Sequence, residues 1–182
     1  MKNLSNNKKG FTLIELLAVI VILAILVMLA IPAVTRYLNS ARKNAFSDNA
    51  LRAVEAVRND VIEKGMSTTR NNTGTGSGKV VCNGTSCYYG LDAINALLET
   101  KLVTSSYGGD FKANANNSAV CIYVDNENNK YVMTMVDSGK NGFVDLEAGA
   151  TGNKAINAET VADNVDVTTA SVAPAACGGA NS

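Results

Sequence analysis

The sequence predicts an α+β protein in which one long N-terminal helix packs on a small antiparallel β-sheet. Three observations support this fold class. The stretch from Leu16 to Val34 is continuously apolar, and residues 35–64 contain neither Gly nor Pro and have a helical spacing of apolar side chains. After residue 79, short segments alternate apolar and polar residues between turn-forming sequences, which is typical of antiparallel strands.

Composition narrows the classes of function. The 182 residues contain 16 basic and 16 acidic side chains, so the formal net charge is zero. A chain without surplus positive charge is not expected to have nucleic acid as its main partner. The chain has no His, which is the side chain used most often for acid–base catalysis near neutral pH and for metal binding. Because no catalytic triad or metal-binding spacing is present either, we expect no enzyme activity, no cofactor and no metal ion.

The apolar stretch has the length of a membrane span. Its 19 residues would form a helix of roughly 28 Å, close to the thickness of a bilayer core. Lys2, Lys8 and Lys9 precede it and favour a cytoplasmic N-terminus, whereas Arg36, Arg42 and Lys43 lie on the other side. A long domain follows these later cations, and such domains cross the membrane largely regardless of charge.

Two ordinary explanations leave Glu15 without a role. A secretory signal would be cut after the apolar stretch, but Ala30-Ile31-Pro32 fits a small-x-small cleavage site poorly. A plain anchor explains the length and the lysines. It does not explain a carboxylate in the span, which costs about 2.5–3.5 kcal/mol and is therefore more often functional than accidental.

Residues 8–17, which read KKGFTLIELL, closely resemble the processing motif of type IV prepilins. The resemblance implies cleavage after Gly10 by a membrane peptidase and N-methylation of Phe11. Glu15 then becomes the fifth residue of the mature chain, where this family carries a glutamate, and Pro32 falls where many members have a proline. The resemblance covers the N-terminal third and implies a pilin-like fold.

The family resemblance also implies a mode of assembly. Phe11, Glu15 and Pro32 are the expected assembly residues, and pairing of Glu15 with the amine of a neighbouring subunit would offset the cost of an apolar environment. Glu15 also lies in the first helical turn, where the helix dipole favours an anion, and both roles can coexist. The chain departs from several pilins in lacking a glycine before Pro32, and Pro32 alone removes one helical hydrogen bond.

We therefore expect three parts: a cleaved leader at 1–10, a transmembrane and filament-core helix at 11–34, and a globular domain at 35–182. The globular domain would include the amphipathic half of the helix, where Val54, Val57 and Val61 mark the apolar face and Gly65 the end. The full helix, about residues 12–64, would be roughly 80 Å long.

The remaining elements are predicted from alternation and turn residues. A polar, Gly-rich connection is expected at 66–79, and Val165–Thr169 is a candidate edge strand. Leu91, Ile94, Leu97, Leu98 and Leu102 mark a short second helix. The predicted strands are Lys79–Cys82, Cys87–Tyr89, Ala119–Val124, Lys130–Val136 and Gly142–Leu146.

Cys82, Cys87, Cys121 and Cys177 allow three disulfide pairings, and zinc is the weaker alternative because no His or finger-type Cys pair is present. Cys82 with Cys87 could bridge a small hairpin. Cys121 with Cys177 would then attach the tail to the sheet, similar to the C-terminal disulfide loop of many pilins.

A calcium site is the alternative reading of Asp137, Asn141, Asp145 and Glu147. The calcium-loop template fails at its third position, Gly139, and at its twelfth, Ala148, so an Asn-Gly hairpin is preferred.

Two functions follow from the same N-terminus. The first is a filament subunit, such as the major pilin of a Gram-positive bacterium. The Lys- and Asn-rich, His-free composition favours a low-GC bacterium with a single membrane. The filament subunit would be a single-pass membrane precursor and then part of a surface pilus for adhesion, motility or biofilm formation. The resemblance implies a prepilin peptidase, an assembly ATPase, a membrane platform protein and identical subunits as partners. The alternative is a pseudopilin of a type II secretion or DNA-uptake system.

Overall fold

The computed structural model describes residues 10–65, 80–82, 85–111, 119–167 and 177. The chain divides into two units, which meet between Asn39 and Ser40 and are described separately. One helix, α1 (Leu13–Lys64), contributes to both. The predicted polar connection at 66–79 lies outside the described residues.

In the first unit, α1 is a bare apolar helix. Its large hydrophobic side chains from Leu13 to Val34 are all exposed, and it passes through Pro32 without ending. Proline has no N–H, so the carbonyl of Met28 loses its usual helical partner. The hydroxyl of Thr35 donates to the carbonyls of Ile31 and Pro32, each at 3.1 Å, and so adds side-chain hydrogen bonds next to Pro32.

In the second unit, α1 has one buried face and ends as the sequence predicts. Its buried positions recur at spacings of three and four residues, from Phe46 to Val61. Gly65 adopts a positive φ of 68°, and its N–H donates to the carbonyl of Val61 at 2.9 Å. This left-handed geometry ends the helix and is unfavourable for residues that have a Cβ.

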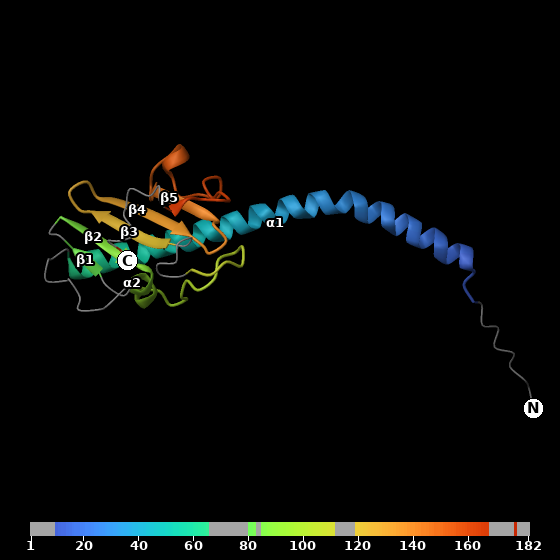
Figure 1. Ribbon diagram of the computed structural model, residues 1–182, viewed down its shortest axis with the longest axis horizontal. Helices are drawn as coiled ribbons and strands as arrows, with labels where there is room; N and C mark the ends of the chain where they lie inside the picture. The colour runs from blue at the N-terminus through green and yellow to red at the C-terminus, as the bar shows by residue number, and fades with distance from the viewer. Residues whose placement is uncertain (1–9, 66–79, 83–84, 112–118, 168–176, 178–182) are drawn as a thin grey trace, which may run out of the picture. The chain divides into compact units, whose positions relative to one another are not determined.

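The sheet has five antiparallel strands in sequence order, β1-β2-β3-β4-β5 (Figure 1). A short helix, α2 (Leu91–Leu97), connects β2 to the segment before β3. The strands are β1 (Val80–Cys82), β2 (Ser86–Gly90), β3 (Ala119–Asp125), β4 (Lys130–Val136) and β5 (Gly142–Glu147). The α+β fold class is therefore confirmed, with the five expected strands within one residue of their predicted ends.

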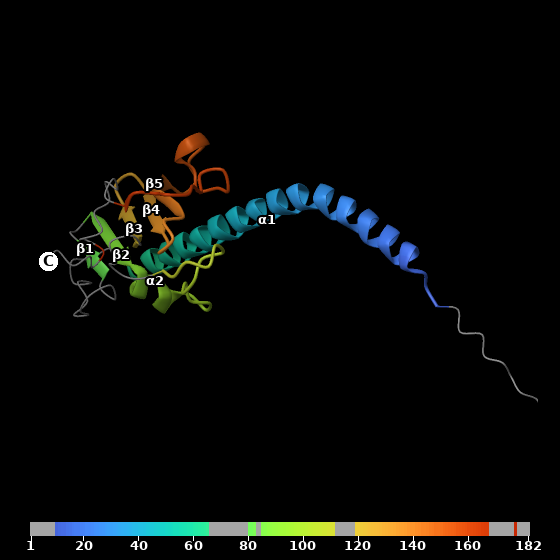
Figure 2. The ribbon, with the colours of Figure 1, turned by 45° about the vertical axis from the view of Figure 1, so that its right-hand side comes forward.

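The core lies between α1 and the inner face of the sheet (Figure 2). Alternate residues of β3 and β4 contribute to this core, as the two-residue repeat requires, whereas in β5 a register shift against β4 places Phe143 and Leu146 there. Phe46 is the centre of an aromatic group, with ring centroids 5.7 Å from Phe111 and 6.0 Å from Phe143. Leu102 is buried in this core although the helix predicted to include it ends at Leu97.

The outer face of the sheet is partly covered by the C-terminal segment. Val167 packs against Ala119 and Val136, and Cys177 is bonded to Cys121 of β3. The predicted edge strand from Val165 is wrong for residues 165–167, which form no strand, and residues 168–169 lie outside the described residues. The N–H of Val165 instead donates to the carbonyl of Lys140 as the chain turns onto the outer face.

Candidate functional site

The candidate site is the segment Gly10–Glu15 together with the apolar helix that follows it. Gly10 and Phe11 precede α1, and both are exposed. A Cβ built on Gly10 would meet no atom within 4 Å. No contact within the described part of the chain therefore requires glycine at this position.

Thr12 and Glu15 form a reciprocal cap at the start of α1. A Glu15 carboxylate oxygen, Oε2, accepts hydrogen bonds from the Thr12 N–H and the Thr12 hydroxyl, both at 2.8 Å. The Glu15 N–H donates to the Thr12 hydroxyl oxygen at 3.3 Å. This arrangement is a capping box, which satisfies N–H groups that have no partner within the helix. Sequence analysis missed Thr12, although the spacing of Thr12 and Glu15 is the known signature.

The cap leaves part of Glu15 available. Both bonds from Thr12 go to Oε2, and Oε1 has no hydrogen-bond partner among the described residues. An ionised carboxylate can accept about four hydrogen bonds. Glu15 can therefore keep its bonds to Thr12 and accept a further donor through Oε1.

The helix after this cap is exposed along its whole apolar length. Phe11 is 90% exposed and Leu13 83% exposed, and none of the most apolar 18-residue window of α1 is buried. In the part of the chain that the structure describes, α1 is the one helix long and apolar enough to cross a membrane. A surface of this kind is stable in water only when lipid or other protein covers it.

The four cysteines form two disulfides. Cys82 bonds to Cys87, its direct cross-strand partner in the β1–β2 hairpin. Cys121 bonds to Cys177, 56 residues away, and this bridge packs beside Tyr88 and Tyr123 on the outer face of the sheet. These are the two pairs that the sequence analysis placed first. Burial next to Tyr123 raises the pKa of the Tyr88 hydroxyl.

The residues considered for calcium are already bonded to other groups. Asp137 is fully buried, and its Oδ1 accepts the N–H groups of Gly139 and Asn141 at 2.8 and 2.9 Å. Its Oδ2 accepts the hydroxyl of Ser105 at 2.5 Å. The N–H groups around this carboxylate direct hydrogens toward it and have no lone pair to offer a cation, so they cannot share a calcium ion with it.

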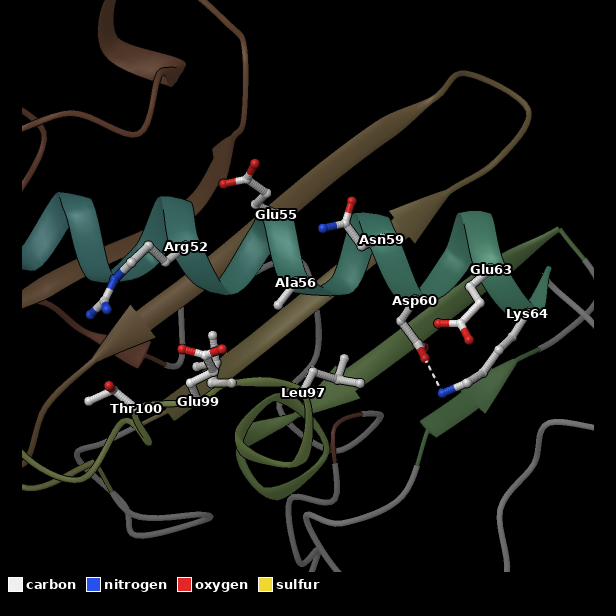
Figure 3. Close-up of a pocket in the computed structure, with 11 residues that line it drawn as sticks. Arg52, Glu55, Ala56, Asn59, Asp60, Glu63, Lys64, Leu97, Glu99 and Thr100 are labelled. Carbon is white, nitrogen blue, oxygen red and sulfur yellow. Dashed lines mark hydrogen bonds and ion pairs between the residues drawn. The ribbon is translucent and has the colours of Figure 1, made fainter.

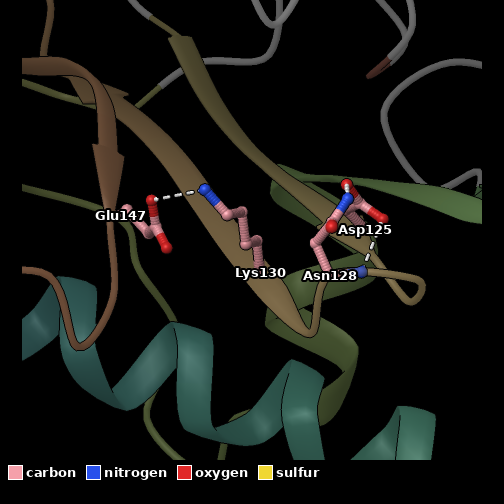
Figure 4. A network of polar contacts seen from close by, with 4 residues as sticks. All are labelled: Asp125, Asn128, Lys130 and Glu147. Atoms are coloured by element: carbon pink, nitrogen blue, oxygen red, sulfur yellow. Dashed lines mark hydrogen bonds and ion pairs between the residues drawn. The ribbon is translucent and has the colours of Figure 1, made fainter.

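The other calcium candidates point to separate partners. Asp145 bonds to the Thr134 hydroxyl, and Glu147 lies 3.5 Å from the Lys130 ammonium (Figure 4). Among the described residues no group of three or more His, Cys, Asp or Glu is arranged to hold a metal ion. The network around Asp137 instead ties the β4–β5 turn to the loop that contains Ser105.

Comparison with protein families identifies the N-terminal segment. Residues 5–31 match the model of the prokaryotic N-terminal methylation motif. Together with the long apolar helix, this match fits a type IV pilin-like prepilin, a class of structural proteins. The matched residues include Gly10, Phe11, Thr12 and Glu15. No curated protein and no solved structure matched the chain.

Proposed function

We propose that this protein is a structural subunit of a type IV pilus. It is cut after Gly10, methylated on the new N-terminus at Phe11, and polymerised through the apolar half of α1 into a surface filament. The single observation that carries the proposal is the methylation motif, matched at residues 5–31, at the start of a fully exposed apolar helix. Adhesion, surface motility or biofilm formation is the role that such a filament would serve.

The energetics favour burial of this helix among other copies. Burying one Leu, Ile or Val side chain stabilises an assembly by about 1.5–3 kcal/mol. More than a dozen such side chains are exposed between Leu13 and Val34. The membrane covers them in the precursor, and a bundle of identical helices would cover them after extraction.

Glu15 would set the position of one copy relative to the next. In an apolar surrounding an unpaired carboxylate is costly, and a charged amine relieves that cost. Cleavage after Gly10 creates such an amine on Phe11, and Oε1 of Glu15 has no partner in the described subunit. We infer that Oε1 receives the amine of a neighbouring copy while Thr12 keeps Oε2.

The proposal implies three further partners besides identical subunits. A prepilin peptidase would cut the precursor, an assembly ATPase would drive extraction, and a membrane platform protein would transmit that work to the subunit. The precursor would cross the cell membrane once with its N-terminus in the cytoplasm, and the mature chain would lie outside the cell.

Intact mass and N-terminal fragmentation of protein sheared from the cell surface test the proposal. We expect a chain that begins at methylated Phe11 in the filament fraction. A chain that begins at Met1 and stays in the membrane would mean a plain anchor. A processed chain without extended surface filaments would favour the pseudopilin function, because the same motif serves both.

A substitution at Gly10 tests the proposed cleavage site directly. Gly10→Leu should accumulate as uncut, membrane-bound precursor, because a bulky side chain beside the cleaved bond would obstruct the peptidase. The fold itself should be unaffected, since a Cβ at Gly10 meets no neighbouring atom. Normal cleavage of this variant would contradict processing at Gly10.

A further inference from the structure

An acidic groove lies between α1 and the end of α2 in the second unit (Figure 3). Its volume is about 430 Å³. One wall is formed by α1, and the other by α2 and the residues after it. The lining residues are Arg52, Glu55, Ala56, Asn59, Asp60, Glu63, Lys64, Leu97, Leu98, Glu99 and Thr100.

The α1 wall is anchored to the core. The Tyr89 hydroxyl, which is fully buried, donates to Oδ2 of Asp60 at 3.0 Å. The ammonium of Lys64 lies 2.6 Å from Oδ1 of the same carboxylate. Bonds to a buried tyrosine hold this turn of α1 in place, so the groove is a fixed feature of the fold.

The remaining charges of the groove are unbalanced. Glu55, Glu63 and Glu99 are exposed, and none of them has an ion-pair partner among the described residues. The other cation of the groove, Arg52, contacts the side-chain oxygen of Asn49. The groove therefore carries surplus negative charge and suits a cationic side chain.

A suitable cation is present on the same flank of α1. Arg42 is exposed and has no ion pair within the described part of the chain. Its backbone is fixed, since the Ser106 hydroxyl donates to the Arg42 carbonyl at 2.7 Å. Eighteen residues, or five whole helical turns, separate Arg42 from Asp60, so the two residues lie on the same side of α1.

Arg42 cannot reach the groove of its own subunit. Five helical turns correspond to about 27 Å along the axis, whereas an extended Arg side chain is much shorter. Arg42 and the acidic groove therefore have complementary charges but lie at different heights along α1. They can meet only when a second copy is displaced along the helix axis and also turned about that axis by roughly half a turn, because an unturned parallel copy would point its Arg42 away from the groove.

We propose that the groove receives Arg42 of a second, parallel copy of this chain. The displacement would be about 20–32 Å, which places Arg42 between the levels of Glu55 and Glu63. Because the two contacting surfaces differ, the interface is heterologous and can repeat without closing, as a filament requires. This inference rests on the proposed filament function and assigns a contact between globular domains.

A charge swap tests the contact in full-length protein expressed in its own cells. Arg42→Glu and the pair Glu63→Lys/Glu99→Lys each place like charges together, and we expect about tenfold less subunit in the sheared filament fraction. Combining all three substitutions should restore assembly. Lys140→Glu, an exposed charge reversal on the β4–β5 turn, is the matched control and should assemble normally.

A disulfide cross-link gives an independent readout of the same geometry. Arg42→Cys combined with Glu63→Cys should yield intermolecular dimers and higher ladders in filaments, whereas either single variant should not. Protease resistance of the membrane-bound subunit verifies that each variant is folded. Full assembly of Arg42→Glu, or failure of the triple variant to recover, would overturn the contact. In both cases normal wild-type filaments would leave the proposed function intact.

Discussion

At the scale of single residues, Glu15 caps the start of α1 in the structure and has a second role in the proposed assembly. In the structure its Oε2 caps the first turn of α1 through Thr12, while Oε1 has no partner among the described residues. The local role uses Oε2, and the proposed intermolecular role would use Oε1. The two roles are therefore compatible. The capping role agrees with the position of Glu15 in the first helical turn, and the assembly role is the one that the family resemblance implies.

This division of roles predicts graded effects of substitution. Glu15→Ala should still be cut after Gly10 but should be absent from sheared filaments, because the partner of the Phe11 amine is lost. Thr12→Val should reduce assembly less, since loss of an N-terminal capping hydroxyl costs about 1 kcal/mol. Quantitative immunoblots of filament and membrane fractions measure both effects.

Thr12→Ser is the control for the cap, because serine keeps the hydroxyl and is an equally good capping residue. It should assemble like the wild type. If Thr12→Ser and Thr12→Val were equally defective, the hydroxyl would not be the relevant group. Unimpaired assembly of Glu15→Ala would remove the role of the carboxylate.

At the scale of elements, the β3–β4 hairpin shows how local polar groups fix a turn. Oδ1 of Asp125 accepts the N–H groups of Glu127 and Asn128 at 3.0 and 3.2 Å, and Oδ2 accepts the Asn128 side-chain amide at 2.8 Å (Figure 4). Asn129 then adopts a positive φ of 50°, which Asn tolerates better than most residues. The turn thereby connects two strands in register over seven residue pairs.

The same bonds make the hairpin sensitive to acid. The Asn128 side-chain amide and the N–H groups of Asn128 and Glu127 lower the pKa of the Asp125 carboxyl below its usual value. A carboxyl whose pKa is lower in the folded state stabilises the fold above its unfolded pKa, near 3.9, and loses that contribution as pH falls through the folded value. Stability should therefore decrease below about pH 4.

Thermal unfolding of the full chain in detergent micelles, followed by circular dichroism between pH 6 and pH 2, measures this contribution. Asp125→Ala should have a lower Tm than the wild type at pH 6, and the difference should shrink toward pH 2. Glu127→Ala is the control, since only the backbone of Glu127 bonds to Asp125. A difference between wild type and Asp125→Ala that is constant with pH would exclude the carboxylate as the cause.

At the scale of the whole molecule, the two disulfides differ in the length of chain that they close. Cys82–Cys87 joins neighbours in one hairpin, five residues apart. Cys121–Cys177 closes a loop of 56 residues and attaches the C-terminal segment to the outer face of the sheet. Closing a longer loop removes more entropy from the unfolded chain.

The chain-entropy relation gives the expected ranking. Removal of Cys121–Cys177 should cost about 4 kcal/mol, and removal of Cys82–Cys87 about 2 kcal/mol. Urea unfolding of the two double-serine variants in micelles measures the difference. Equal losses, or a larger loss for the hairpin bridge, would mean that native packing outweighs chain entropy.

Much of this molecule follows from patterns that are local in the chain. Helix α1, its end at Gly65 and the five strands are readable because periodicity, turn residues and the absence of Gly and Pro act over a few residues. The Thr12–Glu15 cap was equally readable from spacing and was overlooked. The proposed processing segment Gly10–Glu15 is also local, because it consists of adjacent residues of the methylation motif.

Other features were not readable because they depend on residues far apart in the chain. The network of Asp137 with Ser105, the bond of Tyr89 to Asp60, and the acidic groove each join segments that only folding brings together. Residues 165–167 form no strand because contacts with Ala119 and Val136 outweigh their β-propensity. The sequence by itself determined the helix, the strands and the processing motif, since these depend on short-range rules. Only the tertiary structure decided which polar groups are satisfied and which charges remain available, because those depend on long-range packing.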